Sequence, residues 1–166
     1  MKNRGKAWKF GDNISTDLIA PGRLFHLRSN LPELAKHVLE DARPEFPGLI
    51  REGDFVVAGE NFGQGSSREH APTIIKIAGA RAVLAKSFAR IFYRNCINIG
   101  LPAVICDTDR IDEGDELELH LADGFVENHT KGIRLPISPL SPAMERILQE
   151  GGLVAYVRKH GDLDMA

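Results

Sequence analysis

Three glycines, two adjacent serines and one arginine lie within residues 59–72, and these residue types together favour anion binding or serine chemistry. An apolar run at residues 54–58 comes directly before this stretch and predicts a strand. Apolar residues at helical spacing follow from Ala71 to Ala78, and Gly79 is suited to end that helix. A turn from a strand into a helix directs backbone N–H groups and the positive end of the helix dipole at whatever lies in front of it. The stretch is therefore predicted to bind an anion.

The spacing within this stretch excludes three familiar glycine-rich turns. A phosphate-binding P-loop requires Lys directly after its last Gly, but Ser66 follows Gly65 here. A dinucleotide-binding fingerprint would require Gly at position 68, which is Arg68. A hydrolase nucleophile elbow requires Gly two residues after the serine, and Arg68 again occupies that position relative to Ser66.

A purely structural role for the turn has similar support from local sequence. Ser66 and Glu69 have the spacing of a helix capping box, and glycines serve any tight turn. Two residues favour a functional turn. Pro72 is tolerated only in a first helical turn, so the helix should begin near Ala71 and leave the serines in the loop. A cation near a helix N-terminus is disfavoured by roughly 0.3–1 kcal/mol, so Arg68 is easier to explain if an anion binds beside it.

Composition limits the function classes. The chain has 166 residues and a net charge of -2, which fits a single α/β domain over residues 1–166 and gives no sign of a nucleic-acid or membrane surface. We see no signal peptide and no apolar run of the ~20 residues that a membrane span needs. Cys96 and Cys106 are too few and wrongly spaced for a zinc or iron–sulfur ligand set, so we expect buried free thiols and a cytoplasmic location.

Hydrophobic patterns predict the elements around the turn. The expected strands are residues 7–10, 54–58, 81–85, 101–106 and 116–121, the last paired in a hairpin with residues 125–126. The expected helices are residues 31–39 after Asn30, 71–78, 88–99 capped by Ser87, 143–149 after Ser141, and 153–159. Strand, helix and strand in this order predict a βαβ unit with parallel pairing. Residues 23–30 and 43–50 are expected to be connections without regular structure.

Two polar features remain open from sequence alone. Asp17 lies in the polar segment 11–17, where it can satisfy a turn through its own backbone or face the anion seat. The polar side of the helix at 88–99, which includes Arg90 and Asn95, is expected to face solvent, and the alternative is a face that meets a partner or an anion.

Three ordered motifs resemble the aconitase superfamily: residues 12–17, residues 65–72 and residues 85–95. The length of the chain and the sequence at 150–153 look like the separate small subunits of the 3-isopropylmalate dehydratase branch. The resemblance covers nearly the whole chain. It implies a three-layer β/β/α swivelling domain that docks over a large subunit carrying a [4Fe–4S] cluster. It also implies a hydro-lyase of leucine biosynthesis that is active only as a heteromer.

The resemblance also assigns roles to individual residues. Ser66 is similar to the serine that, as an alkoxide, removes a proton next to a substrate carboxylate. Ser67 and Arg68 resemble residues that hold a carboxylate, and Asp17 resembles a supporting acid. Backbone N–H groups and Arg68 can stabilise a serine anion, so the physical chemistry agrees with this assignment.

The sequence does not decide between possible substrates. The loop before the first long helix is expected to read the variable arm of the substrate, and it contains both apolar residues and Arg28. An apolar contact fits isopropylmalate, which we favour, whereas Arg28 binding a further carboxylate fits a homoaconitase or a dual-specificity enzyme. A stand-alone anion-binding module is the alternative of another class.

Overall fold

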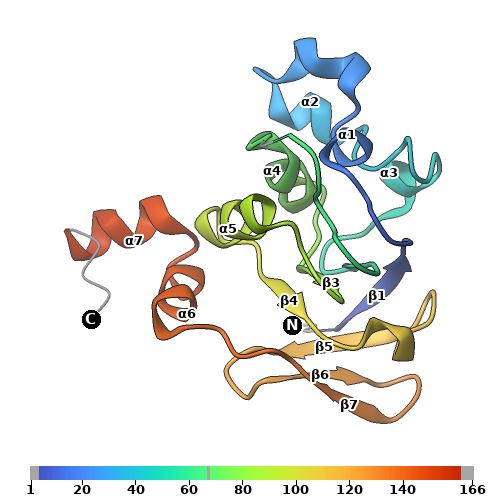
Figure 1. The fold of residues 1–166 in the computed structure, drawn as a ribbon, viewed down its shortest axis with the longest axis vertical. Coiled ribbons are helices and arrows are strands. Elements are labelled where there is room, and N and C mark those ends of the chain that lie inside the picture. The colour runs from blue at the N-terminus through green and yellow to red at the C-terminus, as the bar shows by residue number, and fades with distance from the viewer. Residues whose placement is uncertain (1–3, 67, 162–166) are drawn as a thin grey trace.

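The computed structural model describes residues 4–66 and 68–161, in which seven strands form one mixed sheet of order β4-β3-β2-β1-β5-β6-β7 (Figure 1). The strands are β1 (Arg4–Lys9), β2 (Phe55–Val57), β3 (Ala82–Ala85), β4 (Ala103–Ile105), β5 (Glu116–His120), β6 (Phe125–Asn128) and β7 (Ile133–Pro136). The α-helices are α1 (Thr16–Ile19), α2 (Leu31–Ala35), α3 (Phe46–Leu49), α4 (His70–Ile77), α5 (Arg90–Asn98), α6 (Pro142–Gln149) and α7 (Leu153–His160).

The strands β1 to β4 form the parallel half of the sheet, and α4 and α5 connect β2 to β3 and β3 to β4. This confirms the predicted βαβ arrangement. The carboxyl ends of β2 and β3 therefore lie at one edge, and the turns that leave them toward α4 and α5 are neighbours. Chemistry-bearing residues on these turns are brought together by the parallel topology alone.

The strand β1 also pairs antiparallel with β5, which starts the second half of the sheet. The predicted hairpin is confirmed as β5 and β6, while β7, which pairs with β6, was missing from the sequence prediction. Figure 1 shows these antiparallel strands curled beneath the parallel strands. The sheet thus forms two of the three layers.

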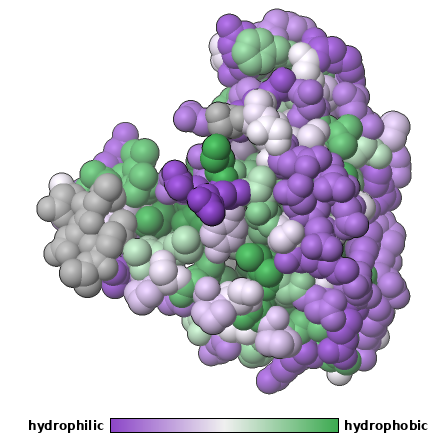
Figure 2. All heavy atoms as spheres, in the orientation of Figure 1, coloured by the Kyte–Doolittle hydropathy of each residue, from purple (hydrophilic) through white to green (hydrophobic). Residues whose placement is uncertain are grey.

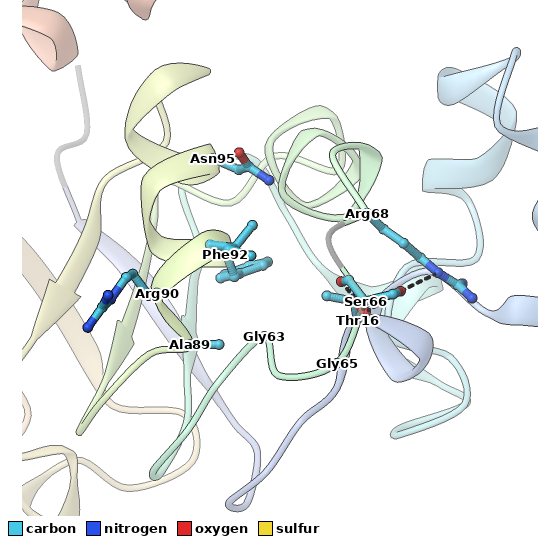
Figure 3. A pocket seen from close by; sticks show the side chains of 10 residues that line it. Thr16, Gly63, Gly65, Ser66, Arg68, Ala89, Arg90, Phe92 and Asn95 are labelled. Carbon is cyan, nitrogen blue, oxygen red and sulfur yellow. Dashed lines mark hydrogen bonds between the residues drawn. The ribbon is translucent and has the colours of Figure 1, made fainter.

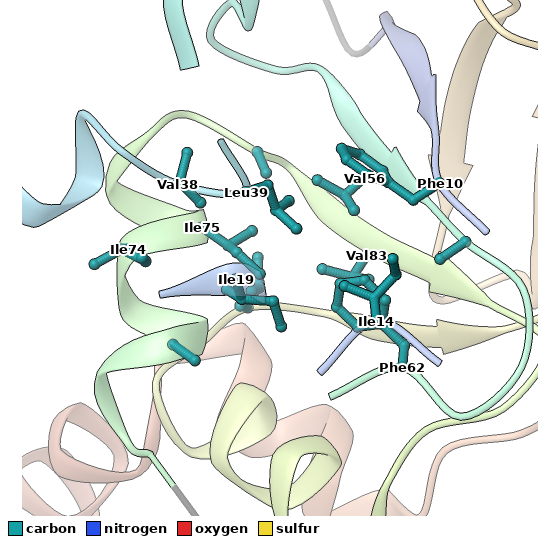
Figure 4. Close-up of a cluster of buried hydrophobic side chains, with 14 of the residues drawn as sticks. Phe10, Ile14, Ile19, Val38, Leu39, Val56, Phe62, Ile74, Ile75 and Val83 are labelled. Atoms are coloured by element: carbon teal, nitrogen blue, oxygen red, sulfur yellow. The ribbon is translucent and has the colours of Figure 1, made fainter. Parts of the chain in front are cut away.

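Alternating side chains of the parallel strands enter two different cores. Val56 and Val83 face the helices, where they join Phe62, Ile74 and other residues shown in Figure 4. Leu84 faces the opposite way, into a core that includes Leu117 of the antiparallel half. Strands buried on both faces explain the continuous apolar runs seen in the sequence. The arrangement is the expected three-layer β/β/α fold.

The two cysteines lie in separate cores, both buried and both free. Cys96 belongs to the helix-side core and Cys106 to the core between the β layers. Burial raises the pKa of both thiols, that of Cys106 to about 12. The prediction of buried free thiols is confirmed.

Several local predictions were wrong. Short helical turns form where the hydrophobic pattern predicted a loop or a longer helix. Residues Gly22–Leu27, expected to be irregular, form a 3₁₀ helix. The helix capped by Asn30 ends at Ala35, and Leu39 adopts a positive φ of 56° that stops any continuation. The connection at 43–50 contains the short helix α3.

Ser87 was predicted to cap the helix that follows it, and this was also wrong. The N-cap of α5 is Ala89, and the Ser87 hydroxyl instead accepts a hydrogen bond of 2.8 Å from the backbone N–H of Asn61. Ser87 therefore ties the strand-to-helix turn after β3 to the turn after β2. Among the described residues, no helix is both long and apolar enough to cross a membrane.

Replacing Gly63 by alanine is expected to destabilise the fold strongly. Gly63 has φ 86°, and an added Cβ would lie 2.2 Å from the Phe92 ring. Gly124 has a similar φ of 81° but open space around it, so Gly124→Ala is a matched control for backbone strain alone. We expect Gly63→Ala to lower the free energy of unfolding by about 1–3 kcal/mol more than Gly124→Ala, as is usual for overpacking. Urea unfolding measures this, and equal losses would show that the turn is not clamped against α5.

Candidate active site

The turn between β2 and α4 is held on one side by the segment that leads into α1. The Gly63 N–H donates to the Ile14 carbonyl at 2.7 Å, and the Thr16 N–H donates to the Gln64 carbonyl at 2.9 Å. On its other side the Phe62 N–H donates to the Ser87 carbonyl at 3.1 Å. The turn at residues 59–72 is therefore joined to the segments 12–17 and 85–95 through backbone hydrogen bonds.

The capping box that was the structural alternative for Ser66 and Glu69 does not form at the start of α4. This helix begins at His70, its N-cap is Glu69, and Glu69 makes no side-chain capping hydrogen bond. The Arg68 N–H instead donates to the Ser66 carbonyl at 2.9 Å. Ser66 is thus in the loop, as the position of Pro72 predicted, and its side chain does not cap the helix.

The Arg68 guanidinium has three partners, one within its own turn (Figure 3) and two in the segment that contains α1. Its Nε donates to the Ser66 hydroxyl at 3.1 Å, and its Nη1 donates to the Ala20 carbonyl at 3.2 Å. Its Nη2 lies 2.7 Å from Asp17 Oδ1. Of the two roles open for Asp17, the structure therefore supports the one that faces the turn. Ser66, Arg68 and Asp17 are brought together, whereas Ser67 lies outside the described residues.

Thr16 completes this arrangement, and sequence reasoning did not single it out. Its side chain is 3% exposed, its hydroxyl donates to the Ser66 carbonyl at 3.1 Å, and its Oγ1 lies 3.4 Å from Ser66 Oγ. The only sequence signal was its place next to Asp17 in the motif at 12–17. A buried hydroxyl beside Ser66 can donate a hydrogen bond to an oxygen that carries negative charge.

A cavity of about 340 Å³ opens in front of these residues. Its lining comes from the turn, from α1 and from the first turns of α5, and comprises Thr16, Gly63, Gly65, Ser66, Arg68, Ala89, Arg90, Ile91, Phe92 and Asn95. Arg90 and Asn95, which were expected to face solvent, both line this cavity; Arg90 is also exposed, as expected, and Asn95 is half-buried. Ser66 and Ile91 are exposed, so the cavity is incomplete as an enclosed reaction site.

Arg28 lies beside the cavity rather than in its lining. Its guanidinium carbon is 4.2 Å from the centre of the Phe25 ring, and its Nη1 donates to the Phe25 carbonyl at 3.1 Å. The Arg68 guanidinium lies 5.9 Å from the same ring, and the His70 ring lies 6.4 Å from it. Burial, and then the charges of Arg68 and Arg28, lower the pKa of His70. Arg28 and Arg68 therefore both lie close to Phe25, and the charges of both lower the pKa of His70.

The residues of this chain do not fit an iron–sulfur cluster. Cluster irons are held mainly by cysteine thiolates, which must be deprotonated and must converge. Cys96 and Cys106 lie in different cores, and burial raises both pKa values, so neither favours a thiolate. The described part of this chain offers no cysteine pair for such a group.

Comparison with known proteins agrees with the fold and the turn. The family described as Aconitase C-terminal domain matches residues 49–107, the segment that contains the Ser66 turn. The class is thus an aconitase-type three-layer domain. The crystal structure of a 3-isopropylmalate dehydratase from Methanocaldococcus jannaschii superposes with a TM-score of 0.91 at 44% identity, covering 97% of this chain and 96% of that one.

Relatives define the family more closely. This chain is 66% identical to 3-isopropylmalate dehydratase small subunit 2 of Archaeoglobus fulgidus over 98% of its length and 99% of the relative. It is 58% identical to small subunit 1 of Thermotoga maritima, covering 95% of this chain and 96% of the relative. A methanogen homoaconitase small subunit from Methanothermobacter thermautotrophicus is 52% identical, covering 94% of this chain and 91% of the relative. The chain belongs to the family of 3-isopropylmalate dehydratase small subunits.

Removing the charge of Arg28 is expected to raise the pKa of His70, because that positive charge is one of the causes that lower it. Arg28→Lys keeps the charge and should change the pKa less. Arg134→Ala is the matched control, since Arg134 also lies over a phenylalanine ring, 4.5 Å from Phe125. Titration of the histidine ring signals by NMR measures the effect. An unchanged His70 pKa in Arg28→Ala would place Arg28 outside the site.

Proposed function

We propose that this chain supplies the base and the carboxylate-binding arginine of a two-subunit hydro-lyase that interconverts 2-isopropylmalate and 3-isopropylmalate in leucine biosynthesis. The observation that carries the proposal is the hydrogen bond of 3.1 Å from Arg68 Nε to Ser66 Oγ, within a loop that opens on a cavity. A serine hydroxyl is a weak base until its anion is stabilised, and a guanidinium in direct contact provides that stabilisation.

The Ser66 alkoxide would take the proton from the substrate carbon next to a carboxylate. The electron pair of that C–H bond becomes the C=C bond as the hydroxyl leaves the neighbouring carbon. Adding water back with the opposite regiochemistry gives the isomer, with Ser66 returning the proton. Arg68 Nε is positioned to stabilise the alkoxide, and the Thr16 hydroxyl, 3.4 Å away, would do so once its one proton turned from the Ser66 carbonyl to the alkoxide.

The substrate carboxylate would lie against the Arg68 fork, with Ser67 as a second contact. A guanidinium binds carboxylates in bidentate fashion. Asp17, 2.7 Å from Nη2, would act as a positioning residue that keeps this fork oriented toward the cavity. Arg28 and Phe25 at the rim would meet the variable arm of the substrate.

A large subunit would complete the site and carry the [4Fe–4S] cluster that this chain does not fit. Such a cluster supplies a Lewis acid for the departing hydroxyl when bound. Exposed apolar side chains support a covering partner: Ile91 in the cavity lining, Phe25 near Arg68 and Val154 on α7 are 50%, 48% and 64% exposed. Figure 2 shows hydrophobic surface in the hollow between the C-terminal helices and the rest of the domain. The pair would form a heterodimer or heterotetramer. The free thiols fit a cytoplasmic enzyme.

Reconstitution tests this proposal. The chain would be mixed anaerobically with a cluster-bearing large subunit from the same source and assayed with isopropylmalates, and with homocitrate and homoisocitrate. We expect no turnover by either subunit alone and a preference of the pair for isopropylmalate. Preference for the tricarboxylates would contradict the substrate assignment and make Arg28 the ligand of the further carboxylate. Tight phosphate binding by the chain without partner-dependent turnover would instead support a stand-alone anion-binding module.

Ser66→Ala should lower the kcat of the assembled enzyme by about 10²–10⁴-fold, the usual contribution of a general base. The KM should change little, because Arg68 remains. Ser138→Ala, an exposed serine outside the three motifs, serves as the control and should behave as the unaltered chain. Near-normal turnover of Ser66→Ala would rule out its role as the base.

A further inference from the structure

The hairpin of β5 and β6 carries a cluster of two glutamates and two histidines on its outer face. Glu118 and Glu127 are directly opposite each other in the register. Leu117 and Val126, their neighbours along the strands, are buried in the core between the β layers. Because side chains alternate between the faces of a strand, Glu118, Glu127 and His120 point outward. His129, two residues after Glu127, joins them.

The side-chain atoms of this cluster converge. His129 Nε2 lies 2.8 Å from Glu118 Oε1 and 3.9 Å from Glu127 Oε1. His120 Nε2 lies 3.3 Å from Glu127 Oε1 and 3.6 Å from Glu118 Oε2. The nearest ligand atoms of Glu118, Glu127 and His129 all lie within 4.8 Å of one another.

These separations match those between ligands of one tetrahedral ion. Zinc binds histidine nitrogen and carboxylate oxygen at about 2.0–2.2 Å, which places neighbouring ligand atoms at the corners of a tetrahedron about 3.3–3.6 Å apart. The four observed distances fall on both sides of that value. Glu118, Glu127 and His129 already lie close enough together to share one ion, and His120 would join them by a rotation of its side chain.

Protein contacts satisfy part of the cluster, because the hydrogen bond from His129 and the charges of His120 and Arg4 lower the pKa of Glu118. Two carboxylates directly across a strand pair repel each other. His120 Nε2 is buried and makes no hydrogen bond in the described structure, although both carboxylates lie near it. The His120 ring is also fixed, with its centre 4.5 Å from that of Phe125.

We propose that Glu118, His120, Glu127 and His129 form a binding site for a divalent transition-metal ion of the zinc type. Two imidazoles and two carboxylates form a ligand set that suits zinc, and a metal would satisfy the His120 nitrogen and offset the repulsion between the glutamates. The ion would connect β5 to the end of β6 and so stabilise the outer layer of the sheet. The site shares no residue with the cavity at Ser66.

Zinc titration of the full chain, free of any affinity tag and stripped of metal by a chelator, tests the proposal. Isothermal titration calorimetry should give one zinc ion per chain with a Kd in the micromolar range or tighter. His129→Ala and Glu118→Gln should each weaken binding by at least about tenfold, and zinc should raise the Tm of the unaltered chain but not of these variants. Cobalt(II) bound in place of zinc should give the visible absorption of a tetrahedral site.

His160→Ala is the matched control, because His160 pairs with a single glutamate, Glu150, at 3.1 Å and lacks a second pair of ligands. It should leave zinc binding unchanged. His129→Gln, which keeps a polar group, guards against a folding defect, and the Tm of each variant in chelator should stay close to that of the unaltered chain. Absence of saturable binding by the unaltered chain, or binding that survives in both His129 variants, would overturn the proposal.

Discussion

The Arg68 guanidinium is the group on which the geometry of the site depends. It contacts the Ser66 hydroxyl, the Ala20 carbonyl and the Asp17 carboxylate at once. These partners come from the turn after β2 and from α1, so one planar side chain fixes two loops relative to each other. The same positive charge lies at the N-terminal end of α4, where it is unfavourable without an anion nearby. The Asp17 carboxylate balances part of this positive charge, and a substrate carboxylate would balance the rest.

The sheet explains why the loops can be so short and so closely packed. Parallel pairing of β2 with β3 brings the turns after them to one edge, where Ser87 binds the backbone of Asn61. Gly63 then permits the turn to pass directly over Phe92 of α5. The antiparallel strands cover the opposite face of the parallel strands and contribute nothing to the cavity lining. The cavity and the glutamate–histidine cluster therefore lie in different layers of the fold.

Much of this arrangement could be predicted from the sequence because its patterns are local and strong. The buried runs of β2 and β3, the helix that contains Pro72 and the N-cap Ser141 each depend on residues within one element. The 3₁₀ helix at Gly22–Leu27 and the strand β7 were missed because neither has a clear hydrophobic period. Thr16 was missed for another reason. Its importance comes from contacts with Ser66, fifty residues later, and from burial that no local pattern reveals.

The kinetic constants of the assembled enzyme carrying Arg68→Lys test the central role of this guanidinium most directly. Lysine keeps the charge but donates from a single point, so it cannot serve Ser66, α1 and a substrate carboxylate together. The account predicts a KM for isopropylmalate raised by about tenfold to a hundredfold, the usual effect of losing a charged hydrogen bond. Arg94→Lys, an exposed arginine of α5 outside the cavity lining, should leave the KM unchanged. An unchanged KM in Arg68→Lys would contradict the account.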